Sequence, residues 1–204
     1  MREPINVSGM VLSASPVGEY DKRVVILTRE LGKITAFARG ARRMKSPLMA
    51  VSNPFVFGEF QVYEGRDSYT LSGANIKEYF LDLAQMQPGV YYGFYFLELA
   101  EYFGQEGNDE TQMLNLLYVT MNAIRRGKQD LRLIRCIFEL RTITISGEAP
   151  QMFSCMECST KENLTVFSLR DSAIYCPNCG KTIRDPWPLQ PGTVLACRYI
   201  IAAP

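Results

Sequence analysis

Two Cys-x-x-Cys pairs are the residues most able to do chemistry in this chain, which has six cysteines and no histidine. Cys155 and Cys158 form the first pair, Cys176 and Cys179 form the second, and seventeen residues lie between the pairs. This spacing fits the Cys-x2-Cys-x(15–20)-Cys-x2-Cys pattern of zinc sites. A two-residue gap in a tight turn aims both sulfurs at one point, and two such turns complete a tetrahedron of thiolates. We therefore predict one structural Zn²⁺ per chain on these four cysteines.

Other interpretations of the cysteines are weaker, although an empty or degenerate site stays open. Disulfides suit exported proteins, but the N-terminal residues show no apolar signal segment and no run approaches the ~18 apolar residues of a membrane span. A thioredoxin-like centre needs one Cys-x-x-Cys at a helix start, not two. A zinc deaminase is echoed by Glu157, but Tyr175 stands where that signature has proline. Cys158 would also fill the position that a catalytic zinc keeps for water.

Four further predictions concern the two remaining cysteines, Gly180, the net charge and the absence of histidine. Cys136 and Cys197 lie in apolar stretches, where we expect them to be buried as small hydrophobes. Gly180 follows the second pair, where we expect a turn that needs positive φ. Four thiolates and their zinc ion would change the net charge from +1 to about −1, so any nucleic-acid contact must be local. The absence of histidine removes the usual general base and the Ser-His-Asp and Cys-His arrangements, which disfavours an enzyme.

The elements that must position these residues change character along the chain. Residues 1–78 carry five short β-rich segments punctuated by glycine and proline, which predicts a closed barrel, with an OB-fold that binds nucleic acid as the leading candidate and an SH3-like barrel as the alternative. The expected strands are Val7–Leu12, Arg23–Thr28, Lys33–Ala38, residues 55–62 and Tyr69–Ser72.

Residues 79–150 have helical periodicity and are predicted to form an α-helical domain. One helix is expected after Pro88, a second over Thr111–Arg126 and a third over Leu131–Ile145, with Asp130 and Gly127 as caps. The aromatic rows of the first helix are expected to lie in the core. The rows are Tyr91, Tyr95, Leu99 and Tyr102, with Phe94, Leu97 and Phe103 beside them.

The remaining residues complete an α+β multidomain chain. Residues 151–186 are predicted to form an inserted, zinc-ribbon-like module built on the four paired cysteines. Residues 187–204 are expected to hold a linker and the start of a further helix of the helical domain, which suggests a shortened chain.

A basic segment lies in the predicted barrel, since no acidic residue occurs between Glu30 and Glu59. In an OB-fold the third strand and the loop after it border the groove that takes nucleic acid. Such a density of cations suits phosphate binding without sequence preference, whereas the alternative is a loop whose charges serve only solubility. The cations are Lys33, Arg39, Arg42, Arg43 and Lys45.

A second basic surface is predicted on the helix Leu131–Ile145, which carries Arg132, Arg135 and Arg141 and a single acid, Glu139. Positions 132, 135 and 139 share one helical face, whereas Arg141 projects elsewhere. A basic rim around an apolar groove suits an acidic peptide that ends in a hydrophobic residue. The alternative is that these arginines pair with acids of neighbouring helices. The apolar residues expected beside them are Leu131, Ile134, Phe138 and Ile145.

Taken in order, the motifs of the chain resemble the bacterial RecO family of recombination mediators. The likeness runs through the barrel and reappears just before the cysteine pairs, so it spans nearly the whole chain. Its segments are Gly9–Leu12, Gly18–Val25, Leu27–Lys33, Ala38–Arg43, Phe57–Phe60, Phe138–Arg141 and Ser146–Pro150.

This resemblance implies an OB-fold, a helical domain and an architectural zinc insertion in a cytoplasmic, nucleoid-associated bacterial protein. It also implies binding of single- and double-stranded DNA, annealing of complementary strands and, with RecR, the loading of RecA onto DNA coated by single-strand-binding protein. The C-terminal tail of single-strand-binding protein becomes the expected acidic peptide for the arginines of the third helix. The DNA contacts carried over are Lys33, Arg39, Arg42, Arg43 and Lys45, with Arg23 added.

Two other functions stay open on the sequence alone. The runner-up is a zinc-ribbon and OB-fold adaptor that binds RNA in transcription or translation through the same basic segment. The third is a zinc-dependent hydrolase or deaminase, which would need a water molecule on the metal.

Overall fold

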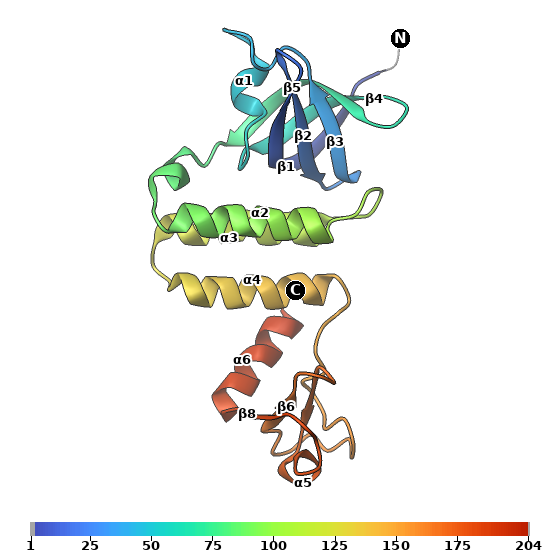
Figure 1. The fold of residues 1–204 in the computed structure, drawn as a ribbon, viewed down its shortest axis with the longest axis vertical. Helices are drawn as coiled ribbons and strands as arrows, with labels where there is room; N and C mark the ends of the chain where they lie inside the picture. Colours follow the sequence, from blue (N-terminus) through green and yellow to red (C-terminus); the bar gives the residue numbers. More distant parts are fainter. Residues whose placement is uncertain (1–2, 204) are drawn as a thin grey trace. The chain divides into compact units, whose positions relative to one another are not determined.

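The computed structural model describes residues 3–203 (Figure 1). These residues form two compact units, which divide between Phe138 and Glu139. The boundary falls inside the helix α4 (Leu131–Ile145), so that one helix contributes residues to both units. In the chain from residue 3 to residue 203, no helix combines the length and the apolar character needed to cross a membrane.

The first unit begins with a closed five-stranded barrel, which confirms the predicted OB-like fold. The strands follow the order β1-β2-β3-β5-β4, and β1 closes the barrel because it pairs with both β2 and β4. All pairs are antiparallel except β3 with β5, and a short helix α1 (Leu48–Val51) connects β3 to β4. The strands are β1 (Ile5–Val17), β2 (Asp21–Thr28), β3 (Gly32–Ala38), β4 (Phe57–Glu64) and β5 (Tyr69–Glu78).

Strand β1 is longer than predicted, since it ends at Val17 and not at Leu12. Residues 5–10 pair with β4 and residues 9–17 pair with β2, with a register shift between Val11 and Ser13 in the pairing with β2. The extra length after Leu12 therefore extends the hairpin with β2, while the contacts that close the barrel lie at the beginning of the strand. Alternate side chains fill the interior, including Ile26, Ile34 and Phe60, which are fully buried.

Helices α2 (Gly89–Phe103) and α3 (Thr111–Arg126) follow the short 3-10 helix η1 (Leu81–Gln85). The predicted end of α3 and the predicted beginning of α4 are correct because neighbouring residues cap these helices. Gly127 ends α3 with φ +60°, and the Asp130 carboxylate accepts the Arg132 N–H at 2.7 Å at the beginning of α4. The inner face of α3 packs into the core. Its buried residues are Met113, Leu114, Leu117, Thr120, Met121 and Ile124.

The predicted core face of α2 is right for Leu97, which is buried, but wrong for Tyr91 and Tyr102, which are 61% and 80% exposed. The helix packs through Phe96, Leu97 and its small residues. A Cβ atom on Gly93 would lie 2.9 Å from the ring of Phe55, and one on Gly89 would lie 2.8 Å from the side chain of Ile124. These close approaches turn the aromatic row away from the core. The buried residues of α2 are Gly89, Val90, Gly93, Phe96, Leu97 and Ala100.

The second unit holds a small antiparallel sheet in the order β7-β6-β8 together with the helices α5 (Pro177–Gly180) and α6 (Pro191–Ala202). Its own core contains Met152, Leu164 and Ile174, with Val194 from α6 packed among them. The three strands are β6 (Val166–Ser168), β7 (Ala173–Tyr175) and β8 (Pro186–Pro188).

Candidate metal centre and nucleic-acid interface

Both cysteine pairs lie in tight turns that use the same main-chain hydrogen bond. The Ser159 N–H donates to the Cys155 carbonyl at 2.9 Å, and the Gly180 N–H donates to the Cys176 carbonyl at 2.9 Å. The first turn leads toward β6, and the second follows β7 directly. Because β6 and β7 form an antiparallel hairpin, the two turns meet at one end of the sheet.

The four cysteine sulfurs come together as a single cluster, with every Sγ within 4.8 Å of the others. The Sγ atoms of Cys158 and Cys176 are 3.9 Å apart. A tetrahedral zinc with Zn–S bonds of ~2.3 Å places neighbouring sulfurs ~3.8 Å apart, so this separation fits the metal. The residues that the sequence predicted can therefore hold one metal ion. Four sulfur donors would complete a closed tetrahedron and leave no open position for water.

The main chain around Cys155 stabilises its thiolate even without a metal ion. Burial opposes the charged form, but the backbone N–H groups of Cys158, Cys176 and Glu157 outweigh it and lower the pKa of Cys155 to about 6. The hydrogen bond with Cys176, together with burial, raises the pKa of Cys179 to about 12. The cluster thus favours some negative charge but not four thiolates at once. A divalent cation would remove the remaining protons.

Gly180 is needed for a reason other than the predicted one. It does not lie among the glycines with positive φ in the described chain; it ends α5 in helical backbone. A Cβ atom at this position would instead approach the side chain of Val166 on β6 to 2.9 Å. The second cysteine turn therefore packs directly against the hairpin, and that contact requires a residue without a side chain.

The two other cysteines do not belong to this cluster. Cys136 is exposed on α4, so its predicted burial is wrong. The helix turns this residue away from Ile134 and Phe138, which are buried. Cys197 on α6 is partly buried and packs against the core of the second unit.

Residues 39–46, called the basic loop below, are tied to the turn between β1 and β2. The Arg42 N–H donates to the Tyr20 carbonyl at 2.8 Å, and its guanidinium donates to the Glu19 carbonyl at 3.2 Å. The Gly40 N–H donates to the Asp21 carboxylate at 2.7 Å. These bonds hold the main chain of the loop in place while its cationic side chains stay in solvent.

Five of the six predicted DNA contacts gather at this end of the barrel. Arg23 pairs with Phe37 near the end of β3, directly before the basic loop. All five side chains are exposed, although the guanidinium of Arg42 also donates to the Glu19 carbonyl and that of Arg43 lies over the Tyr20 ring. They are Arg23, Arg39, Arg42, Arg43 and Lys45.

Lys22 also belongs to this group, although the sequence analysis missed it. Its ammonium donates to the Asn53 side chain at 2.7 Å, and burial together with the charge of Arg42 lowers its pKa. The signal that could have identified it is the hairpin of β2 and β3. In that hairpin Lys22 pairs with Ala38, the residue next to Arg39.

Lys33 lies apart from the other predicted contacts. It stands at the beginning of β3, and five residues lie between it and Arg39, so six steps of ~3.3 Å place the two ~20 Å apart. Its ammonium donates to the Glu101 carbonyl at 2.6 Å. The structure thus places this lysine against α2.

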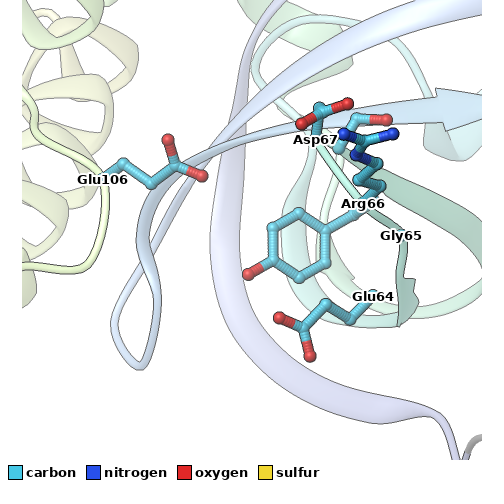
Figure 2. Close-up of a pocket in the computed structure, with 7 residues that line it drawn as sticks. Glu64, Gly65, Arg66, Asp67 and Glu106 are labelled. Carbon is cyan, nitrogen blue, oxygen red and sulfur yellow. The ribbon is translucent and has the colours of Figure 1, made fainter.

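An acidic pocket occupies the same end of β3, where Glu106 pairs with Gly32. Figure 2 shows the carboxylate of Glu106 extending from the loop between α2 and α3 toward the barrel, which contributes Glu64 and Asp67. Burial raises the pKa of Tyr69 in this pocket, and the charges of Glu64 and Glu106 raise it further. Three carboxylates and one guanidinium, that of Arg66, line this pocket, so it is less favourable for phosphates than the basic loop.

Comparison with known proteins matches both parts of the chain to one family. Residues 1–80 match the family described as Recombination protein O N terminal, and residues 89–204 match Recombination protein O C terminal. The chain belongs to the RecO family. The predicted resemblance is therefore confirmed, and RecO membership supports a role in DNA repair and recombination.

Several RecO relatives are similar over most of the chain. The DNA repair protein RecO of Alkaliphilus metalliredigens is 36% identical over 176 residues, which are 86% of this chain and 72% of the relative. The protein of the same name from Caldicellulosiruptor saccharolyticus is 33% identical over 177 residues, with coverages of 86% and 72%. The one from Bacillus subtilis is 29% identical over 195 residues, 93% of this chain and 74% of the relative.

In this member of the RecO family, the three predicted partner-binding arginines have different surroundings. Arg132 is exposed at the start of α4, and the guanidinium of Arg135 lies over the Tyr95 ring, 5.5 Å from its centroid. Arg141 lies in the second unit and donates to the carbonyls of Ile200, Ile201 and Ala203 at the end of α6. Arg141 therefore caps a helix.

The apolar surface beside Arg135 comes from α2. Ile134 and Phe138 are buried in the core and do not contribute to that surface. Tyr91, Tyr92 and Tyr95 instead line a pocket of about 250 Å³ with Arg135. The sequence analysis missed this pocket because it placed the α2 tyrosines in the core.

Proposed function

We propose that this chain is a non-enzymatic recombination mediator of the bacterial cytoplasm and nucleoid. It binds single- and double-stranded DNA, anneals complementary strands and, with RecR, helps to load RecA onto DNA coated by single-strand-binding protein. RecO family membership supports this proposal. The observation that carries the DNA-binding step is the basic loop, whose exposed arginines project from a main chain anchored on the β1–β2 turn.

Phosphate neutralisation accounts for both binding and annealing. Two complementary strands repel each other through their phosphates, and a surface of arginines and lysines lowers that repulsion without reading the bases. Annealing breaks no covalent bond, so it needs no catalytic group. The anchored loop keeps several cations at one place, which reduces the entropy lost when a strand binds.

Zinc serves an architectural role in this proposal. The four cysteines would hold it between the two turns, where it supplies the positive charge that keeps the thiolates deprotonated. X-ray absorption should show a single sulfur shell near ~2.3 Å. A shell that includes nitrogen or oxygen would contradict the closed site.

The DNA-binding step is tested with the triple variant Arg39→Ala, Arg42→Ala and Arg43→Ala. Because each phosphate contact contributes ~0.7–0.9 to the slope of log affinity against log salt, we expect the slope to fall by about 2–3. The loss should be similar for unrelated DNA sequences. Fluorescence anisotropy over a salt series measures both quantities.

A matched control removes cations from the same barrel but outside the basic loop, with Arg66→Ala and Lys77→Ala. This control should keep the affinity and most of the slope. If the triple variant also keeps both, the charges only solvate the loop. Tighter binding and faster annealing of RNA than of DNA of the same sequence would favour the RNA-adaptor function instead.

A partner site is proposed for the acidic C-terminal tail of single-strand-binding protein at Arg132, Arg135 and the tyrosine pocket. At about 250 Å³ the pocket is smaller than typical small-molecule sites, and it suits one apolar side chain. The two arginines provide positive charge for the acidic residues of a peptide.

A fluorescent tail peptide tests this site. Arg132→Glu with Arg135→Glu should weaken its binding at least tenfold, because attraction becomes repulsion. Arg126→Glu with Lys128→Glu reverses the same number of charges at the end of α3 and should change the affinity little. Equal affinities for both double variants would place the peptide elsewhere.

A further inference from the structure

An exposed aromatic ring lies beside the basic loop. Tyr20 precedes β2 in the β1–β2 turn, and 42% of its surface is accessible to solvent. The guanidinium of Arg43 lies over its ring, 5.0 Å from the centroid. One side of the Tyr20 ring therefore contacts a cation, and the rest of the ring is open to solvent beside the basic loop.

The main chain that carries Tyr20 is fixed on both sides. The Tyr20 carbonyl accepts the Arg42 N–H at 2.8 Å, and the preceding Glu19 carbonyl accepts the Arg42 guanidinium at 3.2 Å. Asp21, which follows, accepts the Gly40 N–H at 2.7 Å. Burial of a large apolar ring does not explain its position, because the ring remains exposed. These bonds hold it in place before any ligand arrives.

We propose that Tyr20, backed by Arg43, stacks on an unpaired base, so that this surface prefers single-stranded over duplex DNA. The proposal rests on the proposed function, because phosphates must first bind at the basic loop. Aromatic rings stack on every type of base without reading sequence. In a duplex the faces of the bases are already stacked on one another, so the ring can reach only unpaired bases.

Met44 extends the same contact. It follows Arg43 at the tip of the basic loop, and 89% of its surface is exposed. An apolar side chain of this size between Arg43 and Lys45 would contact neighbouring bases while the cations contact phosphates. The surface thus combines both groups that bind a single strand, cations for the backbone and apolar atoms for the bases.

The test compares three probes of equal length: oligo(dT), an abasic strand with the same phosphates, and a duplex. Tyr20→Ala should lower the affinity for oligo(dT) by about 5- to 100-fold, the range expected for one stacked base, while the other two probes change less than twofold. Tyr20→Phe should retain binding to oligo(dT). Tyr20→Leu, which keeps apolar bulk without a ring, should resemble Tyr20→Ala.

The controls separate this proposal from the one on which it rests. Tyr63→Ala removes a ring of similar exposure, 37%, from β4 and should leave all three affinities unchanged. Equal losses on all three probes for Tyr20→Ala would mean that the ring only supports the loop, and no loss on oligo(dT) would exclude stacking. The triple arginine variant should weaken all three probes, and if it does not, the proposed function of the loop fails independently of Tyr20.

Discussion

At Gly180 the space available to a side chain is smaller than one carbon atom requires. A Cβ there would lie within 2.9–3.0 Å of three side-chain atoms of Val166, one of the strand residues that support the cysteine cluster. Valine is branched at Cβ and cannot rotate all of these atoms away. The second cysteine turn can therefore keep its geometry only with glycine at this position.

Replacing Gly180 by alanine should push the second turn off β6 and loosen the metal site. We expect weaker metal retention against a chelator and a lower melting temperature for the second unit, since overpacking typically costs about 1–3 kcal/mol. Gly192→Ala is the control, because a Cβ on Gly192 meets no atom within 4 Å. Equal metal retention in the two variants would show that the turn can move without loss.

At the scale of the secondary-structure elements, the carboxylate of Glu78 links the end of β5 to α3 through an ion pair. Glu78 accepts the Arg125 guanidinium at 2.8 Å and the N–H groups of Tyr79 and Phe80 at 3.1 and 3.3 Å. The hydrogen bond from Arg125 lowers the pKa of Glu78, and the two backbone donors add to this against the effect of burial. Because the folded pKa lies below the unfolded value of about 4.3, the stabilisation is present above that pH and is lost as the pH falls through the folded pKa.

Glu78→Gln should therefore reduce the free energy of unfolding of the first unit by about 1 kcal/mol at neutral pH. The difference from the parent protein should shrink as the pH falls through the lowered pKa of Glu78, where Glu78 itself becomes protonated. Urea unfolding at several pH values measures this. Glu59→Gln breaks an ion pair with Lys77 whose side chains are about half exposed, and it should have almost no effect. A pH-independent difference would contradict the role of ionised Glu78.

The element limits that the sequence predicts well are those set by neighbouring residues. Asp130 and Gly127 bind or terminate the adjacent helix backbone, so their effect is visible without the fold. The buried face of α2 depends on distant residues, since Gly93 faces Phe55. A row of small residues, Gly89, Gly93 and Ala100, is the helical signal that identifies this face in retrospect.

At the scale of the whole molecule, the two candidate sites belong to different compact units. The basic loop lies within Met1–Phe138, and the four cysteines lie within Glu139–Pro204. Each unit has its own buried core. A metal ion on the four cysteines would therefore stabilise residues that do not include the proposed phosphate contacts.

Removing the metal, by chelation or with Cys176→Ser, should expose the second unit to proteolysis and leave the barrel folded. DNA affinity at the basic loop and its salt slope should change less than twofold. Limited proteolysis with mass spectrometry locates the cleavage sites. Loss of the salt slope after metal removal would show that the units depend on each other for DNA binding.

The sequence identifies which residues belong to each candidate site better than it predicts how far apart those residues lie. The Cys-x-x-Cys spacing and the hairpin between the pairs bring the sulfurs together, because the contacts are local. Lys33 and Arg39 are close in sequence, but the extended strand between them places them ~20 Å apart, at ends of opposite charge. The clustering of positive charges in the sequence does not show this separation, which follows from the extended conformation of β3.

The small sheet of the second unit has two edges that accept no further strand. On one edge, β8 reads Pro-Trp-Pro, and neither Pro186 nor Pro188 has an N–H to donate. On the other, Gln151 pairs with Ala173 and accepts the Ile174 N–H at 2.9 Å. Exposed strand edges are where β proteins aggregate by pairing with a second copy. The prolines of β8 and the bridge at Gln151 therefore disfavour polymerisation of the second unit through its small sheet.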